Sequence, residues 1–215
     1  KMFVHPADLA ASIVEGTRLG VDLDLRGVHW REIRDRIFDR IDPLAARGRG
    51  HRQQSDNVTV FDARARFVGP RVIAAGSRPF VPDLDGLTSV DYETSDTVMR
   101  LPELPRSMII IGGGYISAEF AHIFSAFGTS VTVLNRSEVL LRREDAELLG
   151  RRVEVRLEAS VQLIEPTSDG RVRVHFSGVE GAQERLEADV LLIATGRAPN
   201  GDTLDLVRGG INVDH

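Results

Sequence analysis

The sequence of 215 residues predicts an α/β fold built around a parallel sheet, and two observations carry this prediction. First, segments with apolar residues at helical spacing are interspersed with short apolar or alternating runs, which are typical of strands. Second, the apolar run Met108–Ile111 leads through three glycines into a helical pattern, and a second apolar run, Ser130–Leu134, follows. A strand, a helix and a strand in that order form a βαβ unit, whose two strands run parallel.

Two amphipathic helices are predicted in the N-terminal part, over residues Asp8–Val14 and Trp30–Ile41. In the second segment, Ile33 and Ile37 belong to one apolar stripe with helical spacing. Pro43 follows, and it is predicted to end this helix because proline lacks the backbone N–H that a helix interior uses.

Strands and a crossing are predicted next. Asn57–Phe67 partly alternates, and Arg71–Ala75 is a short apolar run, so both are predicted to be strands. Ser77–Gly86 contains two prolines and a glycine within ten positions, which disfavour both helix and sheet, and we interpret it as a crossing between domains. The run Ser95-Asp96-Thr97 then predicts the start of a helix.

The C-terminal half is predicted to continue with strands. Val153–Ile164 and Arg171–Phe176 alternate on either side of the turn sequence Ser168-Asp169-Gly170, which predicts a hairpin. Asp189–Ala194 is an apolar run typical of a buried strand. The longer segment Asp189–Pro199 (DVLLIATGRAP) also echoes the earlier Arg71–Pro79 (RVIAAGSRP), although no repeat of solenoid length is present.

Composition excludes several classes of protein. The 27 Lys and Arg and 32 Asp and Glu residues give a net charge of −5, and 42% of residues are hydrophobic, as in ordinary globular proteins. The scattered charge disfavours a nucleic-acid partner, and no apolar run approaches the ~20 residues of a membrane helix. There are no cysteines, and the six histidines lack paired spacing, so no metal site is predicted. No secretory signal is recognised, so a cytoplasmic location is expected.

The glycine motif Gly112-x-Gly114-x-x-Ser117 follows an apolar strand and opens a helix predicted over Tyr115–Phe127. Gly112 allows a tight turn, and Gly114 lets a pyrophosphate approach the backbone at the helix N-terminus, where free N–H groups and the helix dipole favour an anion. Ser117 replaces a third glycine with another small residue. This context predicts a dinucleotide site; the alternative is a glycine-rich loop that binds no ligand.

The end of the second strand predicts which nicotinamide cofactor binds. In an NAD site an acidic residue about 20 positions past the glycines holds the ribose 2′-hydroxyl. Here that position is Asn135, and Arg136 and Arg142 follow. Because guanidinium groups bind a 2′-phosphate and a carboxylate would repel it, NADP is favoured over NAD. The alternative is that both arginines are solvated surface charges.

Several motifs together resemble a family. AAGSRP, YETSDTVMRLPELP, GGGYISAEFAHIFSAFG, VTVLNRSEVLLR and ATGRAPN occur in the order found in the flavin-dependent pyridine nucleotide-disulfide oxidoreductases, which include glutathione reductase and lipoamide dehydrogenase. The resemblance implies a Rossmann-like NADPH domain, residues 77–196, inserted into an FAD-binding domain formed by residues 1–76 and 197–215. Gly76 and Gly196 would mark the two crossings.

The resemblance also implies roles for individual residues. Tyr115 matches the aromatic gate over the flavin, and Glu119 matches the glutamate that pairs with a lysine there, for which Lys1 is the candidate; these three are the expected catalytic residues. The alternatives are a packed core tyrosine, an exposed helix carboxylate and a disordered terminus. The residues expected to bind a cofactor at the glycine motif and beyond the second strand are Gly112, Gly114, Tyr115, Ile116, Glu119, Asn135, Arg136 and Arg142. The other expected cofactor-binding residues are Ala74, Ala75, Gly76, Ser95 and Asp96 on the flavin side, Arg197 beside both flavin and nicotinamide cofactor, and Gly196 at the second crossing.

The implied activity is hydride transfer from NADPH to FAD, with electrons passed to a cysteine pair and then to a small-molecule disulfide, for which mycothione is favoured. The family's cysteine pair, first glycine fingerprint, dimerisation domain and His–Glu pair match nothing in these residues, and a homodimer is expected of the complete protein. The segments Pro70–Val72 and Asp145–Gly150 are shorter than the corresponding segments of the family. Either residues are missing from the sequence at these two places, or the whole chain is a remnant. We favour the first explanation. Two alternatives remain: an NADH-linked enzyme resembling lipoamide dehydrogenase, and a non-catalytic dinucleotide-binding module.

Overall fold

The structure is a computed structural model that describes residues 2–61, 65, 76–140 and 153–210. The chain forms two compact units, Lys1–Asp35 with Pro79–Gly196, and Arg36–Arg78 with Arg197–His215. The helices are α1 (Val4–Arg18), α2 (Trp30–Gln53) and α3 (Tyr115–Ala126). The strands are β1 (Ser77–Pro79), β2 (Glu93–Thr94), β3 (Ser107–Ile111), β4 (Ser130–Leu134), β5 (Val153–Arg156), β6 (Ser160–Pro166), β7 (Val172–Ser177), β8 (Gln183–Ala188), β9 (Val190–Ile193) and β10 (Arg197–Pro199).

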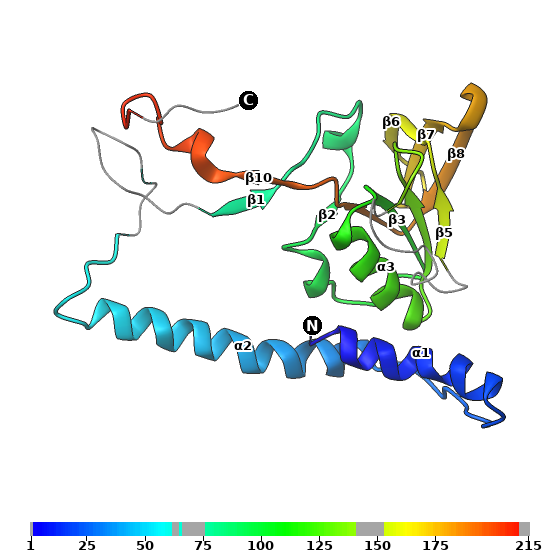
Figure 1. Cartoon of the computed structure of the whole chain (residues 1–215), viewed down its shortest axis with the longest axis horizontal. Coiled ribbons are helices and arrows are strands. Elements are labelled where there is room, and N and C mark those ends of the chain that lie inside the picture. The colour runs from blue at the N-terminus through cyan, green and yellow to red at the C-terminus, as the bar shows by residue number, and fades with distance from the viewer. Residues whose placement is uncertain (1, 62–64, 66–75, 141–152, 211–215) are drawn as a thin grey trace. The chain divides into compact units, whose positions relative to one another are not determined.

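The first unit is built on a five-stranded sheet in the order β2-β9-β3-β4-β5, with every neighbouring pair parallel (Figure 1). β3 lies at its centre, between β9 and β4, and α3 makes the crossover from β3 to β4. The predicted α/β fold and βαβ unit are therefore confirmed, and so is the buried strand predicted at Asp189–Ala194, which is β9. Continuous burial of β3 from Met108 to Ile111 explains its uninterrupted apolar sequence.

The parallel sheet is covered on both faces. Ile109 and Ile111 of β3 belong to a core that includes Val174 and Phe176 of β7, the middle of the three antiparallel strands β6, β7 and β8. The alternate residues Met108 and Ile110 point to the other face, because successive side chains of a strand alternate. α3 contacts β3 and β4 and supplies buried phenylalanines at positions 120 and 124. Burial on both faces is what a parallel sheet requires.

Strands β6, β7 and β8 form an antiparallel sheet, here called the meander (Figure 1). The predicted hairpin is present as β6 and β7. The single strand predicted over Val153–Ile164 is wrong, because this segment contains both β5 and β6. Between them, Glu158 has a positive φ of 53° and the Ala159 N–H donates to Asn135 O at 2.9 Å. That turn carries the chain from the parallel sheet into the meander.

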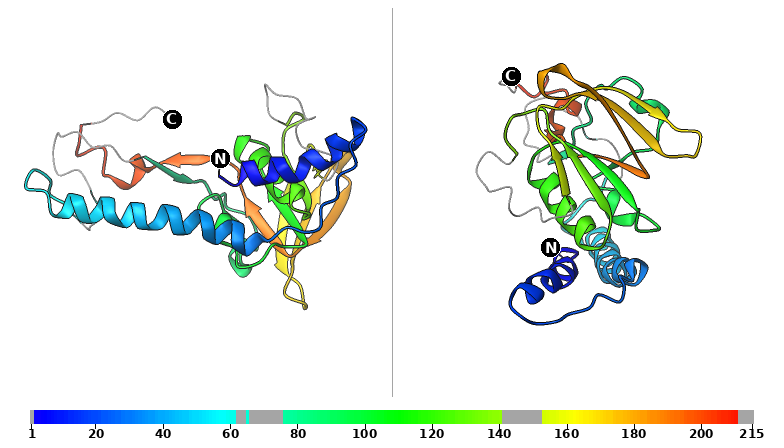
Figure 2. Two further views of the ribbon diagram at one scale, coloured as in Figure 1. Left: turned by 90° about the horizontal axis from the view of Figure 1, so that it is seen from below. Right: turned by 90° about the vertical axis from the view of Figure 1, so that its right-hand side faces the viewer.

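An aromatic cluster joins the N-terminal helices to the βαβ unit. The Trp30 ring lies 5.4 Å from Phe3, 5.6 Å from Phe124 and 6.1 Å from Phe127 between centroids. Trp30 is buried, and its indole Nε1–H donates to Leu101 O at 2.9 Å. α1 lies against α3, as the two views of Figure 2 show. The first turn of α2 is thus part of the first unit.

Both N-terminal helices are longer than predicted, and α2 continues through Pro43 to Gln53. The prediction that Pro43 ends the helix is wrong. An interior proline removes one hydrogen bond and costs ~3 kcal/mol, but it does not forbid continuation. The residues Leu44, Ala45, Ala46 and Arg47 are strong helix formers, and Arg47 Nε donates to Pro43 O at 3.3 Å.

A short ribbon of β1 and β10 belongs to the second unit except for Pro79. β1 contradicts the prediction that Ser77–Gly86 excludes sheet. Pro79 and Pro199 each stand at the end of a strand, where no N–H is needed for pairing. The Arg78 guanidinium also binds both carboxylate oxygens of Asp202, at 2.9 and 2.6 Å.

Other predicted elements have different outcomes. The described part of Asn57–Phe67 is not a strand, and the strand at Arg71–Ala75 lies outside the described residues. Beyond Ser95-Asp96-Thr97 the chain makes a short 3₁₀ helix, Val98–Arg100. The assignment of residue ranges to flavin and nicotinamide domains stays a prediction. Among the described helices, none combines the length and apolar character needed to cross a membrane.

Candidate dinucleotide site

The candidate site begins at the carboxyl end of β3, where Gly112 turns the chain towards α3. Gly112 has a φ of +125°, and its N–H donates to Leu134 O at 2.9 Å. A Cβ at this position would lie 2.3 Å from Ala194 O, at the end of β9. Glycine is required here for two reasons, because the backbone conformation and the adjacent strand both exclude a side chain. The turn thereby lies at the carboxyl edge of the sheet, beside the ends of β4 and β9.

The next two glycines have different surroundings. A Cβ on Gly113 would lie 2.4 Å from Asn135 Cγ, so this glycine allows the turn to pack on the residue that follows β4. A Cβ on Gly114 would meet no described atom within 4 Å. Gly113 therefore serves packing, whereas Gly114 leaves open space beside the first turn of α3.

The N-terminus of α3 carries N–H groups that no side chain caps. Gly114 is the N-cap residue, with extended φ and ψ of −93° and −176°, and it accepts a hydrogen bond from the Ala118 N–H at 3.1 Å. The first N–H groups of a helix have no intrahelical partner, and the helix dipole places positive charge at this end. Such a terminus can bind a phosphate through backbone donors alone.

Ser117 fills the third position of the glycine motif. Its side chain is buried, and its Oγ donates to Ala194 O at 3.4 Å. The same carbonyl oxygen is the one that a Cβ on Gly112 would strike. Strand β9 therefore approaches both the turn and the helix, and a small residue at position 117 suits that close packing.

Asn135 lies directly after β4 and is buried, with 6% of its surface exposed. Its amide Nδ2 donates to Ser137 O at 3.1 Å and to Val139 O at 2.9 Å. Both amide hydrogens are thus committed to shaping the loop beyond β4. The structure assigns Asn135 a part in loop geometry, and its predicted contact with a ribose hydroxyl stays a prediction.

Arg136, in the same loop, is exposed. Within the described ranges it has neither an ion-pair nor a hydrogen-bond partner, so its charge is available to a ligand. Arg142 lies outside the described residues. Of the two arginines predicted to bind the 2′-phosphate, the structure therefore describes only Arg136.

Tyr115 and Glu119 lie one turn apart near the start of α3. Tyr115 is 63% exposed, so it is not the packed core residue that its aromatic character also allows. Glu119 is exposed and Ile116 half-buried. Lys1, the predicted partner of Glu119, lies outside the described residues. The roles predicted for these residues in catalysis and cofactor binding stay predictions.

The predicted flavin-side residues fall into separate places. Arg197 donates to Ser77 Oγ and Ser77 O, at 2.9 and 2.7 Å, within the β1–β10 ribbon. Gly76 and Gly196 both have positive φ, of 68° and 144°. Ser95 and Asp96 lie in the turn before the 3₁₀ helix, with Ser95 Oγ 3.4 Å from the Asp96 carboxylate. Ala74 and Ala75 lie outside the described residues.

Two contributors to the site are not evident from the sequence: Gly113 and the carbonyl of Ala194. The sequence signal for Gly113 is that three glycines stand in a row, because the motif Gly112-x-Gly114 by itself would allow any residue at position 113. Nothing local indicates that Ala194 approaches Gly112, because this contact depends on how β9 pairs with β3. In the part of the chain that the structure describes, no group of three His, Asp or Glu residues could hold a metal ion.

Comparison with known proteins supports this interpretation of the fold. A family profile described as pyridine nucleotide-disulphide oxidoreductase matches residues 51–215. Mycothione reductase of Mycobacterium tuberculosis is 36% identical over 247 aligned residues, which cover 100% of this chain and 51% of that protein. Mercuric reductase of Lysinibacillus sphaericus is 32% identical, over 95% of this chain and 37% of that protein.

Solved structures give the same result. The Cu(II) complex of a mutant of RclA, an HOCl-induced flavoprotein disulfide reductase from Escherichia coli, matches with a TM-score of 0.77 and 28% identity. This match covers 100% of the chain and 49% of that structure. The chain therefore spans about half the length of mycothione reductase and of the RclA structure, and 37% of mercuric reductase. By its profile match, its sequence identities and its fold, the chain belongs to the pyridine nucleotide-disulphide oxidoreductase family.

Proposed function

We propose that this chain binds NADPH and forms part of an FAD-dependent disulfide reductase whose substrate is a low-molecular-weight disulfide, mycothione. The observation that carries the proposal is the uncapped N-terminus of α3, which follows the turn at Gly112 and faces open space at Gly114. Backbone donors at the carboxyl edge of a parallel sheet, beside a change in strand order, are the arrangement that receives a dinucleotide pyrophosphate.

The described residues fit a dinucleotide at this turn. The N–H groups at the start of α3 would hold the pyrophosphate, and the absence of a side chain on Gly114 leaves room for its approach. Tyr115 and Glu119 lie exposed beside this position and are proposed to contact the nicotinamide side of the ligand. When bound, NADPH supplies a hydride. The protein's contribution is orientation and the exclusion of water.

The preference for NADPH is proposed from charge. Arg136 is exposed and unpaired within the described ranges, and the loop that carries it is shaped by the Asn135 amide. A guanidinium in this position favours a 2′-phosphate, which carries ~2 negative charges near neutral pH. Glu138 is also exposed in this loop, but the first residue after β4 is not acidic. The NADH-linked alternative lacks its expected acidic residue.

The flavin and the disulfide are proposed from family membership. Gly76, Ser95, Asp96, Gly196 and Arg197 are the described residues proposed to face FAD, which would supply the redox centre between nicotinamide and disulfide. The name of the mycobacterial relative, mycothione reductase, supports mycothione as the substrate. Because the chain has no cysteine, the residues that exchange with the disulfide are not among these 215.

Calorimetric titration of the chain with NADPH and with NADH tests the cofactor proposal. We expect NADPH to bind more tightly, and Arg136→Glu to weaken NADPH binding about tenfold or more while leaving NADH nearly unchanged. Arg185→Glu, an exposed charge change on β8, is the matched control. Equal losses for both cofactors would overturn the 2′-phosphate assignment, and no binding of either would overturn the dinucleotide site itself.

The substrate proposal needs a separate measurement. NADPH oxidation by the natural protein is to be followed with mycothione, lipoamide and oxidised glutathione as electron acceptors, and flavin absorbance is to be recorded before reaction. Flavin absorbance with turnover on mycothione supports the proposal. Turnover of NADH with lipoamide supports the lipoamide dehydrogenase alternative, and a protein without flavin or turnover is a binding module.

A further inference from the structure

One buried side chain contacts both parts of the candidate site. The Asn135 amide Nδ2 donates to Ser137 O and to Val139 O, at 3.1 and 2.9 Å. In addition, a Cβ added to Gly113 would lie 2.4 Å from both Cγ and Oδ1 of Asn135. The amide therefore occupies the space between the glycine turn, where the pyrophosphate is proposed to bind, and the exposed loop 136–139 that follows β4.

The loop 136–139 is held by few contacts. All four of its residues are exposed, and the chain becomes buried again at Leu140. Besides the two hydrogen bonds from Asn135, the Glu158 N–H donates to Ser137 O at 3.3 Å. Within the described ranges no other hydrogen bond or ion pair reaches these four residues. Two of the three described hydrogen bonds that hold the loop thus come from one amide nitrogen.

This pattern of hydrogen bonds requires an amide at position 135. An –NH₂ group has two hydrogens, so it can donate at the same time to the carbonyl oxygens two and four residues further along the chain. A hydroxyl has one hydrogen, and an ionised carboxylate has none. The acidic residue that an NAD site carries at this point would place carboxylate oxygens against two carbonyl oxygens. The closed loop and an acidic residue at position 135 therefore exclude each other.

We propose that Asn135 is a positioning residue that sets the preference for NADPH over NADH. Its amide holds the loop 136–139 in the closed form, and this form fixes the backbone that presents the Arg136 guanidinium to the 2′-phosphate. A charged side chain on a loop that is already ordered loses less conformational freedom on binding, so the same contact gives a tighter complex. Asn135 acts through Arg136 and needs no contact with the ligand. The inference rests on the proposed function, since it concerns the same NADPH site.

A double-mutant cycle between Asn135 and Arg136 tests this coupling, with NADPH and NADH titrated calorimetrically into each variant. Asn135→Leu keeps a similar size, removes both donors and adds no charge, and Asn135→Ala removes the same donors without adding bulk. Each should weaken NADPH binding about tenfold and leave NADH binding within about twofold of wild type. Arg136→Ala should have a similar effect. In the double variant the two losses should not add, because the loop has no guanidinium left to position.

Hydrogen exchange separates opening of the loop from loss of the fold. The Glu158 N–H donates to Ser137 O, so its exchange rate in the free chain reports whether the loop is closed. Asn135→Leu should speed the exchange of this N–H, whereas Arg136→Ala should leave it unchanged. Unchanged exchange in Asn135→Leu would mean that the amide does not hold the loop, and would overturn the inference.

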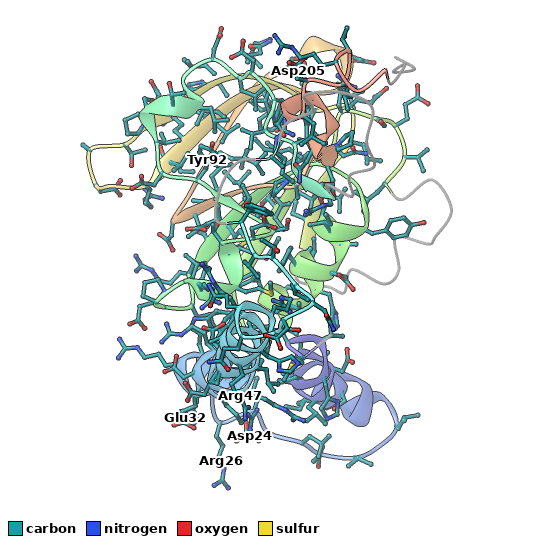
Figure 3. All side chains as sticks on the ribbon, turned by 90° about the vertical axis from the view of Figure 1, so that its left-hand side faces the viewer. Asp24, Arg26, Glu32, Arg47, Tyr92 and Asp205 are labelled. Carbon is teal, nitrogen blue, oxygen red and sulfur yellow. The ribbon has the colours of Figure 1, made fainter. Side chains whose placement is uncertain are left out.

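Each substitution has a matched control. Thr129→Val also removes a buried hydrogen bond, the one from Thr129 Oγ1 to Pro105 O at 2.7 Å, but at the opposite end of β4. Arg26→Ala also removes an exposed arginine without an ion-pair partner in the described ranges, and Figure 3 shows Arg26 pointing away from the helices. Both controls should leave the ratio of NADPH to NADH affinity unchanged.

The outcomes distinguish the inference from the proposed function. A wild type that binds neither dinucleotide, or binds both equally, would overturn the proposed function and this inference with it. A wild type that prefers NADPH, combined with additive losses in the double variant, would overturn the inference alone. So would equal losses of NADPH and NADH affinity in Asn135→Leu, since a merely structural role of Asn135 predicts that result.

Discussion

The polar groups of the meander are paired within the fold, whereas those at the carboxyl edge of the parallel sheet, at the start of α3, are not. On the meander, Arg173 binds Glu165 and Glu187 at 2.9 and 2.8 Å, so its guanidinium is engaged on two sides. At the edge of the parallel sheet, the first turn of α3 has no side-chain cap and faces open space at Gly114. Both regions belong to one unit and share one core. Charges satisfied within the fold contribute to stability, whereas unsatisfied backbone donors at the start of a helix are available to a ligand.

The network on the meander extends beyond Arg173. Arg171 binds Asp169 and Glu187 at 2.8 and 2.7 Å, and His175 Nε2 lies 3.1 Å from Glu165. The His175 and Arg173 hydrogen bonds lower the pKa of Glu165 below its ordinary value. These side chains are partly exposed, so each ion pair contributes little to stability alone, and together the pairs link neighbouring strands of the meander.

The largest expected effect concerns the core that the two regions share. Phe176 is completely buried between the meander and the parallel sheet. Phe176→Ala should lower the free energy of unfolding by about 3–5 kcal/mol, because it removes a large apolar side chain and leaves a cavity. Urea unfolding measures this change. Val179→Ala, at a position 58% exposed, is the control and should change stability little. A loss below ~1 kcal/mol for Phe176→Ala would mean that the two sheets do not share a core.

Gly112→Ala should have the next largest effect on stability. At a φ of +125°, with Ala194 O 2.3 Å from the added Cβ, the substitution combines backbone strain with a steric clash. We expect a loss of about 2–4 kcal/mol in the free energy of unfolding. The same urea titration measures it, and a near-neutral result would show that β9 does not approach the turn as described.

Gly114→Ala separates ligand binding from folding. Its φ of −93° suits any residue, and the added Cβ meets nothing within 4 Å, so stability should stay within ~1 kcal/mol of wild type. If the open space receives a pyrophosphate, NADPH affinity should fall about tenfold. Calorimetric titration together with urea unfolding decides between the two effects. An unchanged affinity would place the dinucleotide elsewhere.

The contrast between the two regions also explains how much the sequence can predict. β3, α3 and β4 are predictable almost to the residue, because the apolar run, the glycines and the helical stripe all indicate the same local structure. The break between β5 and β6 cannot be predicted in this way. The turn at Glu158 is held by a hydrogen bond from the Ala159 N–H to Asn135 O, which follows the neighbouring strand β4. At Pro43 the local signal predicts a helix end that the structure does not have, because the strong helix formers that follow the proline continue the helix.

The candidate site shows the same division. Gly112 and Gly114 can be identified from spacing, since their function follows from backbone conformation near a helix start. The contact between Gly113 and Asn135 cannot, because it depends on two strands lying in register. Asn135 is predicted by its position in the motif, and its side chain proves to be committed to the loop beyond β4. Sequence reasoning thus identifies backbone requirements more reliably than the partner of a polar side chain.

The smallest expected effect is a pH dependence confined to the meander. The Thr167 hydroxyl, which donates to the carboxylate, and next Arg171 lower the pKa of Asp169 from 3.8 to about 2. Because this pKa is lower in the folded state, the contribution to stability is present above pH ~4 and is lost as the pH falls towards ~2. Thr167→Val should therefore raise the pKa of Asp169 towards its ordinary value and flatten the dependence of Tm on pH in this range.

NMR titration of the Asp169 carboxyl carbon measures the shift directly. Arg171→Gln is the matched comparison, because it removes the side-chain hydrogen bond and the Coulombic attraction of Arg171 and keeps the hydroxyl, so it should also raise the pKa of Asp169. A pKa that does not move in Thr167→Val would mean that the hairpin turn is not closed by this side-chain contact. The contrast between the meander and the uncapped end of α3 would then rest on the ion pairs that Arg173 makes with Glu165 and Glu187.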